Sequence, residues 1–203
     1  IFNETGSIKT RNGYTRYNGD PQGASSDQSN TGASTGVLVI DASSDFVAQT
    51  FQPSGDIVVT QVDLYLEMTS SSEEQYVFVE LWSTDSGAPE AILSTDASSQ
   101  KLLISGNSET TYNFRFRTPI SLSTSTTYAL VIKPFLRGTT ATVNSVEVNH
   151  TGTAYANGQV YTSTDTGEAW SGDAAKDVKF VVYDGGDTGG TGLIRFYGND
   201  GIE

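Results

Sequence analysis

The sequence predicts an all-β fold of antiparallel strands with minimal helix. Apolar and polar residues alternate with a period of two in run after run, and turn-forming sequences separate the runs. No stretch shows the 3.6-residue period of a sustained amphipathic helix. Only 17% of the 203 residues are charged, so the polar surface consists largely of Ser, Thr, Asn and Gln. These residues favour strands and turns over helices.

Each clear run has one apolar face. In residues 59–68, for example, Val62, Leu64 and Leu66 point one way while Asp63 and Tyr65 point the other. Two sheets packed face to face would bury such faces, which predicts a sandwich or a barrel. Clear alternation occurs in residues 59–68, 76–82, 111–117, 127–134 and 177–184, and shorter or weaker strands are expected at 36–40, 46–51, 101–105, 143–148 and 159–162. The expected core comprises Leu64, Leu66, Val79, Leu81, Phe114, Phe116, Tyr128, Leu130, Ile132, Phe180 and Val182.

The composition divides the chain into three parts. Residues 34–184 hold nearly all the strand-forming runs, with turns at 53–56 (PSGD) and 83–87 (STDSG) and a two-residue hairpin signal at Asn157-Gly158. Residues 1–33 are rich in Gly, Asn and Ser, and we expect an N-terminal extension or edge strands of another domain there. Residues 185–203 predict a Gly-rich linker followed by a short strand at 193–197.

The charge and the rare residue types narrow the functional classes. The chain has no Cys, a single His and a formal net charge of −13. The lack of Cys excludes disulfides and thiolate sites, and one His makes histidine-based zinc sites and Ser-His-Asp chemistry poor hypotheses. The acidic balance disfavours nucleic acid as a partner, and no apolar run is long enough to predict membrane insertion.

The order of several short motifs resembles a known class of module. The resemblance covers most of residues 46–184 and rests on AQTF (48–51), VELWSTDSGAP (79–89), TTYALV (126–131), GQVY (158–161), Trp170 and DVKF (177–180). Together they resemble the jelly-roll β-sandwich modules attached to secreted bacterial proteins and to phage tail or fibre proteins. The resemblance implies an antiparallel, jelly-roll-like β-sandwich that is extracellular: secreted, at a cell surface or on a virion. The flanks RNGYTRYN (11–18) and GLIRFYGNDG (192–201) resemble edges of β-propeller-like segments in phage tail-associated proteins.

One motif is sharper. Residues 163–170 (STDTGEAW) match the Asp-box pattern S-x-D-x-G-x-[TA]-W through Ser163, Asp165, Gly167 and Trp170. We expect a structural turn, in which Asp165 accepts hydrogen bonds from turn amides, Gly167 supplies a permissive backbone angle and Trp170 packs underneath. A sialidase would need several such boxes, an arginine cluster and a Tyr-Glu pair.

Aromatic residues on the strand faces opposite the core are candidates for binding a ligand. Sugar rings stack on exposed aromatic faces, and polar neighbours complete the hydrogen bonds. The candidate set is Tyr65, Glu67, Tyr76, Phe78, Glu80, Trp82, Asn113 and Arg115. The alternative is that the aromatic residues are covered by the N-terminal segment or a partner subunit, and that Arg115 only balances charge on a solvated face.

Acidic residues near the ends of the predicted domain suggest a metal. Asp41, Asp45, Asp177 and Asp184 are candidates for a structural calcium site, because Ca²⁺ takes six to eight oxygen ligands from such loops. The alternative is that they are solvated loop acids. No cofactor is required by any motif.

These observations favour a non-catalytic, extracellular or virion-borne interaction module. Its expected partner is a glycan or a cell-surface receptor. The alternative function is a structural subunit or domain of a phage tail, receptor-binding protein or surface fibre, whose partners are other virion or fibre subunits. Numerous carboxylates make a glycosidase arithmetically possible, but no pairing in the sequence supports an enzyme.

Overall fold

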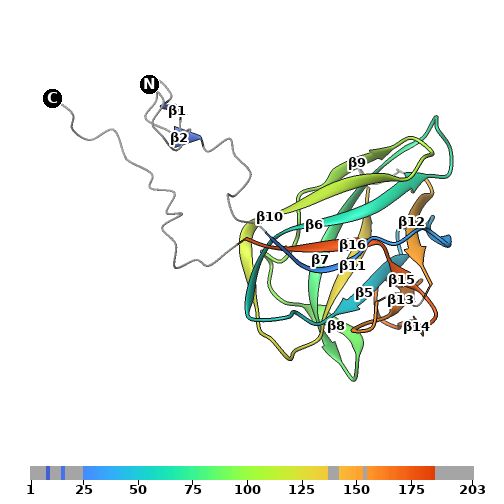
Figure 1. Ribbon diagram of the computed structural model, residues 1–203. Helices are drawn as coiled ribbons and strands as arrows, with labels where there is room; N and C mark the ends of the chain where they lie inside the picture. Colours follow the sequence, from blue (N-terminus) through green and yellow to red (C-terminus); the bar gives the residue numbers. More distant parts are fainter. Residues whose placement is uncertain (1–7, 10–14, 17–24, 137–141, 153–154, 186–203) are drawn as a thin grey trace.

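The predicted all-β architecture is present in the computed structural model, which describes residues 8–9, 15–16, 25–136, 142–152 and 155–185. Two seven-stranded sheets form a sandwich-like arrangement, and every strand pair is antiparallel (Figure 1). The described residues form no helix, and thus none that could cross a membrane. A separate two-stranded pair is made by β1 (Ile8–Lys9) and β2 (Thr15–Arg16).

The first sheet is called the β6 sheet after its central strand. Strand β6 pairs with β10 along one edge and with β12 and β16 along the other, and β4 and β3 pair with β12 and β16. Its strands are β3 (Ser25–Asn30), β4 (Gly36–Ile40), β6 (Ile57–Met68), β10 (Thr110–Leu122), β12 (Val146–Thr151), β15 (Asp177–Val178) and β16 (Phe180–Asp184).

The second sheet is called the β11 sheet. Its strand order is β14-β13-β5-β11-β7-β8, and β9 also pairs with β7. Its strands are β5 (Phe46–Phe51), β7 (Glu74–Asp85), β8 (Ala88–Ile92), β9 (Leu102–Ser105), β11 (Tyr128–Phe135), β13 (Val160–Ser163) and β14 (Ser171–Asp173).

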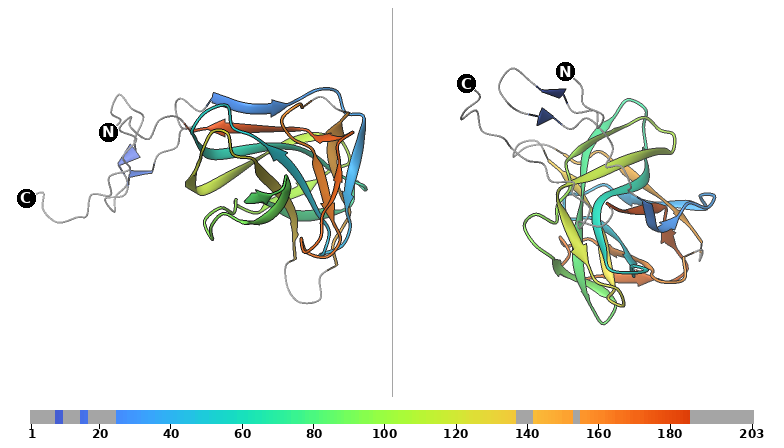
Figure 2. Two further views of the ribbon diagram at one scale, coloured as in Figure 1. Left: turned by 90° about the horizontal axis from the view of Figure 1, so that it is seen from below. Right: turned by 60° about the vertical axis from the view of Figure 1, so that its left-hand side comes forward.

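Consecutive strands alternate between the two sheets over most of the chain. From β4 to β7, and again from β10 to β13, each strand lies in the sheet opposite to the strand before it. The two layers can be followed from three directions (Figure 1, Figure 2). Strands that are neighbours in a sheet are therefore usually distant in the sequence.

The core lies between the sheets and confirms the predicted strand faces. All eleven predicted core residues are buried, and most have no exposed surface at all. The aromatic side chains pack tilted to one another, with the Phe51 ring centroid 6.3 Å from those of both Tyr128 and Phe180. Full burial of one such side chain stabilises the fold by roughly 1.5–3 kcal/mol.

The sheet begins earlier than the expected boundary at residue 34. Strand β3 (SSDQSN) pairs with β16 at an edge, although its sequence has no apolar face. Its last residue, Asn30, is buried, and its side-chain amide donates to Thr151 Oγ1 at 2.8 Å and to the Val178 carbonyl at 2.9 Å. Hydrogen bonds thus fix this strand where apolar burial does not. The strand expected at 193–197 lies outside the described residues.

The hairpin expected at Asn157-Gly158 is wrong. The flanking strands β12 and β13 belong to opposite sheets, so residues 157–158 lie in a connection between layers. Gly158 is not in the left-handed region of backbone space. Glycine is needed there because a Cβ atom would lie 1.8 Å from the carbonyl oxygen of Thr50, in the buried strand β5.

Residues 97–100 close one edge of the sandwich. The Leu81 amide donates to the Ala97 carbonyl at 2.9 Å, while the Gln100 amide donates to the Arg115 carbonyl at 2.9 Å. Leu81 belongs to the β11 sheet and Arg115 to the β6 sheet. This segment therefore joins the two layers beside the place where β10 changes register.

Candidate functional site

The outer face of the β6 sheet gathers polar and aromatic side chains in a regular grid, which we call the polar face. Strand register places Asp63 opposite Asn113 on one side and opposite Val181 on the other. One row along, Gln61 lies between Arg115 and Tyr183. The polar face comprises Gln61, Asp63, Tyr65, Glu67, Asn113, Arg115, Asn149, Lys179 and Tyr183.

Asp63 occupies the centre of the polar face and is only 6% exposed. Its Oδ1 accepts hydrogen bonds from Gln61 Nε2 at 2.7 Å and Asn113 Nδ2 at 2.8 Å, and its Oδ2 accepts one from Tyr183 Oη at 3.0 Å. Arg115 Nε in turn donates to Gln61 Oε1 at 3.1 Å. Four side chains are thereby held around one carboxylate, each from a different position of the sheet.

Tyr183 remains a hydrogen-bond donor over the whole physiological range. Burial, together with the hydrogen bond to the Asp63 carboxylate, raises the pKa of Tyr183 to about 12. The phenol therefore keeps its proton wherever the protein is folded under ordinary conditions. The centre of the polar face consequently has a fixed pattern of donors and acceptors.

Tyr65 supplies the aromatic surface next to this centre. The side chain is half-buried, and the Lys179 ammonium lies 4.5 Å from the centroid of its ring. Lys179 also donates to Glu109 and, at 3.2 Å, to Ser34 Oγ. Burial would raise the pKa of Glu109, but hydrogen bonds from Lys179 and Ser34 outweigh it and keep that pKa below its ordinary value.

Four of the eight predicted ligand-binding residues lie together on the polar face: Tyr65, Glu67, Asn113 and Arg115. Glu67 accepts a hydrogen bond from Asn149 Nδ2 at 3.1 Å. The remaining four, Tyr76, Phe78, Glu80 and Trp82, lie on β7 and so on the outer face of the other sheet. The eight candidates therefore lie on two outer faces and do not form one site, because β6 and β7 are in opposite layers.

Trp82 and Glu80 are also less accessible than a stacking platform requires. Trp82 is only 9% exposed, and its indole N–H donates to Glu80 Oε2 at 2.8 Å. Lys133 pairs with the same oxygen at 3.2 Å, and its ammonium lies 4.6 Å from the ring centroid of Phe46 and 5.5 Å from that of Phe78. Trp82, Glu80 and Lys133 therefore stabilise one another. Among the four candidates on β7, Tyr76 and Phe78 are the two whose side chains are half-buried instead of buried.

The Asp-box turn covers Trp82. The predicted hydrogen bonds are present, since Asp165 Oδ1 accepts from Ser163 Oγ at 2.6 Å and from the Ala169 amide at 2.9 Å. Trp170 meets Trp82 edge to face at a centroid distance of 6.1 Å. Neither the N-terminal segment nor a partner is needed to cover this indole.

Gly167 brings the Asp-box turn close to the sheet. Its φ is 92°, in the left-handed region that favours glycine. A Cβ atom there would lie 3.3 Å from atoms of both Trp170 and Trp82. The geometry supports the structural role expected from the motif, in which the turn and two indoles form a small apolar cluster on the outside of the β11 sheet.

The four predicted calcium ligands do not form one site. Asp41 and Asp45 share the loop before β5, where Asp45 accepts hydrogen bonds from backbone amides of its own loop and its hydrogen bond to Asp41 raises the pKa of Asp41. Asp177 is buried and accepts a hydrogen bond from Gln49 Nε2 at 3.2 Å. Asp184 lies seven residues further along the chain, at the far end of β16 and on the order of 20 Å away. Within the described part of the chain, no three His, Cys, Asp or Glu side chains form a group that could hold a metal ion.

The residues that organise the polar face could not be recognised from the alternation within single strands. Asp63 and Gln61 are two and four residues from Tyr65, so their side chains point to the same outer side of β6. A single acidic residue on that side, however, did not indicate a binding site. Tyr183 lies on β16 and Lys179 immediately before that strand, and both are more than a hundred residues from β6 in sequence. Only the strand order brings them to β6.

No protein-family model matches the chain, and a comparison with curated proteins likewise gives no match. The geometry of the two outer faces is therefore the basis for the functional argument.

Proposed function

We propose that the protein is a non-catalytic, extracellular carbohydrate-binding module, and that the polar face is its glycan platform. The observation that carries the proposal is the arrangement of amide, guanidinium, phenol and carboxylate groups around Asp63, beside the ring of Tyr65. Each group is held by a neighbour on the sheet. The platform is therefore preorganised, which reduces the entropy lost on binding.

Sugar chemistry suits this surface. A pyranose offers hydroxyls that both donate and accept, and an apolar face of C–H groups that can lie against a tyrosine ring. Asn113 is exposed, so its side-chain amide can reach a ligand above the sheet, and the side chain of Arg115 is exposed beside it. Glu67 provides an acceptor, and the opposed charges of Lys179 and the carboxylates give no strong preference for a charged ligand.

A binding role fits Asp63 better than a catalytic role. Both of its oxygens accept hydrogen bonds from neutral side chains, and the residue is nearly buried. A glycosidase would need a second carboxyl group at about 5–9 Å across a cleft, one of the pair with a raised pKa. We assign Asp63 the role of positioning Asn113 and Tyr183. The extracellular assignment rests on the resemblance to modules of secreted and virion proteins.

A glycan array tests the proposal directly. Wild type should be retained by a subset of immobilised glycans, and Asn113→Ala should weaken that binding by about tenfold, the equivalent of one hydrogen bond. The matched control is Asn157→Ala, since Asn157 is an exposed asparagine in the turn before β13. It should bind as wild type does. Retention of no glycan, or equal binding by the Asn113 and Asn157 variants, would refute the proposal.

A structural subunit of a tail or fibre is the second candidate, and a specific surface favours it. On the outer side of the β11 sheet, Leu103 is 38% exposed and lies opposite the half-buried Tyr76, whose neighbour on the other side is the half-buried Phe135. Further along β7, Ile92 is 36% exposed opposite Trp82. Exposed apolar surface of this kind marks protein interfaces.

Light scattering after size-exclusion chromatography separates the two functions. A monomer that binds glycan supports the carbohydrate-binding module. An oligomer that binds no glycan, and that dissociates when Leu103 is replaced by Asp, supports the structural subunit.

A further inference from the structure

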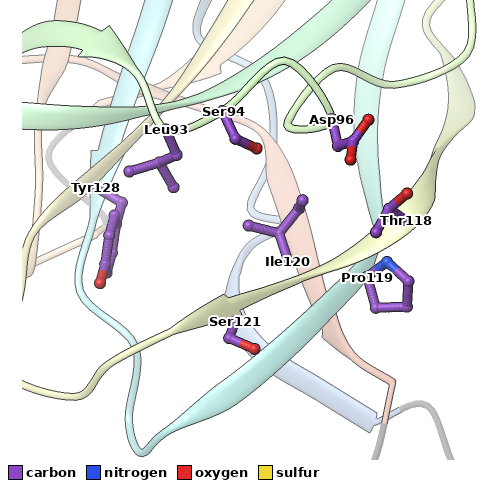
Figure 3. A pocket seen from close by; sticks show the side chains of 8 residues that line it. All are labelled: Leu93, Ser94, Asp96, Thr118, Pro119, Ile120, Ser121 and Tyr128. Carbon is purple, nitrogen blue, oxygen red and sulfur yellow. The ribbon is translucent and has the colours of Figure 1, made fainter.

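We infer that a groove at the edge of the sandwich, distinct from the polar face, binds a single pyranose unit of a neutral saccharide. The inference takes its ligand class from the proposed function and adds a second site. The groove has a volume of about 410 Å³, toward the lower end of the roughly 300–1,000 Å³ of small-molecule sites. It is lined by Leu93, Ser94, Asp96, Thr118, Pro119, Ile120, Ser121 and Tyr128 (Figure 3).

The groove exists because β10 changes register. Pairing with β6 runs to Arg115 and resumes at Ile120. Between them Phe116 makes a bridge to Ser99, in the segment that closes this edge. The strand therefore bends away from β6 and toward residues 93–96, and the groove forms between them. Irregularities of this kind often occur beside binding sites.

The floor of the groove is apolar. Ile120 and Tyr128 are each 8% exposed, and Leu93 is half-buried against the core. Tyr128 Oη accepts a hydrogen bond from the Ser123 amide at 3.0 Å, which fixes the ring in the wall. A sugar's C–H face can lie on such a floor without leaving a polar group unsatisfied.

The rim is polar and carries hydroxyl groups. Ser94, Asp96, Thr118 and Ser121 are all exposed. Figure 3 shows Ser94, Asp96 and Thr118 along one side of Ile120 and Ser121 on the other, so polar groups lie on both sides of the apolar floor. Sugar hydroxyls match this rim because they can donate to the Asp96 carboxylate and both donate to and accept from the hydroxyls.

The charge of the groove selects against anions. Asp96 is the one charged residue among its lining side chains, which include no Lys or Arg. A phosphate or uronate would meet an uncompensated carboxylate. A neutral sugar instead gains a charge-assisted hydrogen bond to it.

Nuclear magnetic resonance with the ¹⁵N-labelled 203-residue chain tests the site. The probes are glucose, galactose, mannose and N-acetylglucosamine, with sodium glucuronate as the anionic comparison. We expect at least one neutral sugar to shift amide resonances of residues 93–97 and 118–122 saturably. Thr118→Val keeps the shape of the side chain but removes its hydroxyl, and it should weaken this binding about tenfold. Asn113→Ala, on the polar face, should leave it unchanged.

The outcomes separate the two proposals. Shifts confined to the polar face would overturn the groove and leave the proposed function standing. A groove response to glucuronate at least as strong as to neutral sugars would overturn the neutral class. No shift with any probe would overturn the groove, and the glycan array then decides the proposed function by itself. Unchanged affinity in both Thr118→Val and Asp96→Asn would also overturn it.

Discussion

Replacement of Gly158 by Ala should destabilise the protein severely, although glycine there has an ordinary backbone angle. The Cβ atom would lie 1.8 Å from the carbonyl oxygen and 2.6 Å from the carbonyl carbon of Thr50. Real Cβ contacts are not shorter than 3.0 Å, so the two backbones must separate by at least 1.2 Å, the difference of 3.0 and 1.8. Thr50 belongs to β5, an interior strand of the β11 sheet, so the shift cannot be absorbed cheaply.

The loss of stability can be estimated from the hydrogen bonds that break when the Gly158 and Thr50 backbones move apart. The Thr50 amide donates to the Gln159 carbonyl at 3.0 Å, and the Gln159 amide donates to Thr50 Oγ1 at 3.0 Å. Losing one buried hydrogen bond costs about 1–3 kcal/mol, and forced overpacking costs about 1–3 kcal/mol. The two contributions together lower the expected free energy of unfolding by about 2–6 kcal/mol.

Urea denaturation followed by tryptophan fluorescence provides the measurement, with Gly55→Ala as the matched control. Nothing lies within 4 Å of a Cβ built at Gly55. That variant should equal wild type or gain up to about 1 kcal/mol, because alanine narrows the unfolded ensemble. If the two variants unfold at the same urea concentration, the close approach of Gly158 to Thr50 is not what requires glycine.

Three further outcomes follow from the packing and the charges. Phe116→Ala should cost about 3–5 kcal/mol because the ring is 7% exposed, and an unchanged urea midpoint would contradict the register of β10. Hydrogen bonds from Ser163 and turn amides lower the pKa of Asp165, so the ionised form stabilises the fold above the unfolded pKa, and this contribution is lost as pH falls through the folded pKa. The difference in melting temperature between wild type and Asp165→Asn, measured by calorimetry, should therefore shrink below about pH 4. A difference that stays constant with pH would show that the ionised Asp165 does not stabilise the turn. In a double-mutant cycle, Lys133→Met and Glu80→Gln should show a coupling of about 1 kcal/mol, since the pair is largely buried, and additive effects on unfolding would exclude this coupling.

The alternation of apolar residues correctly predicted the strands whose position depends on burying one apolar face in the core. Leu64, Phe114 and Phe180 face the core as expected, because an apolar face admits only one register against it. Strand β3 escaped prediction because its contacts are hydrogen bonds, such as those of Asn30, which leave no hydrophobic period. The wrong hairpin at Asn157-Gly158 has a similar cause, since a close approach between distant segments cannot be recognised from a dipeptide.

The candidate site was predicted only in part. The alternation of side chains along each strand put Tyr65, Glu67, Asn113 and Arg115 on the side away from the core, and the strand pairing brings them onto one face of the β6 sheet. The alternation of side chains within a strand does not indicate, however, which strands pair in the same sheet. The central role of Asp63 depends on donors from three strands, and pairing partners over such sequence separations are not encoded in local pattern.

The alternation of strands between layers explains both the partial success and the error. When successive strands lie in opposite sheets, the outward faces of β6 and β7 point away from each other, across two layers about 10 Å apart. Outward residues that are close in sequence are therefore forced onto opposite sides of the molecule, as Tyr65 and Tyr76 are. A surface on one sheet instead combines strands between which the chain has crossed to the other layer and returned, once between β6 and β10 and twice between β10 and β16. The residues around Asp63 and those around Lys133 consequently share no hydrogen-bond partner, so the proposed glycan platform and the outer face of the β11 sheet are physically separate surfaces.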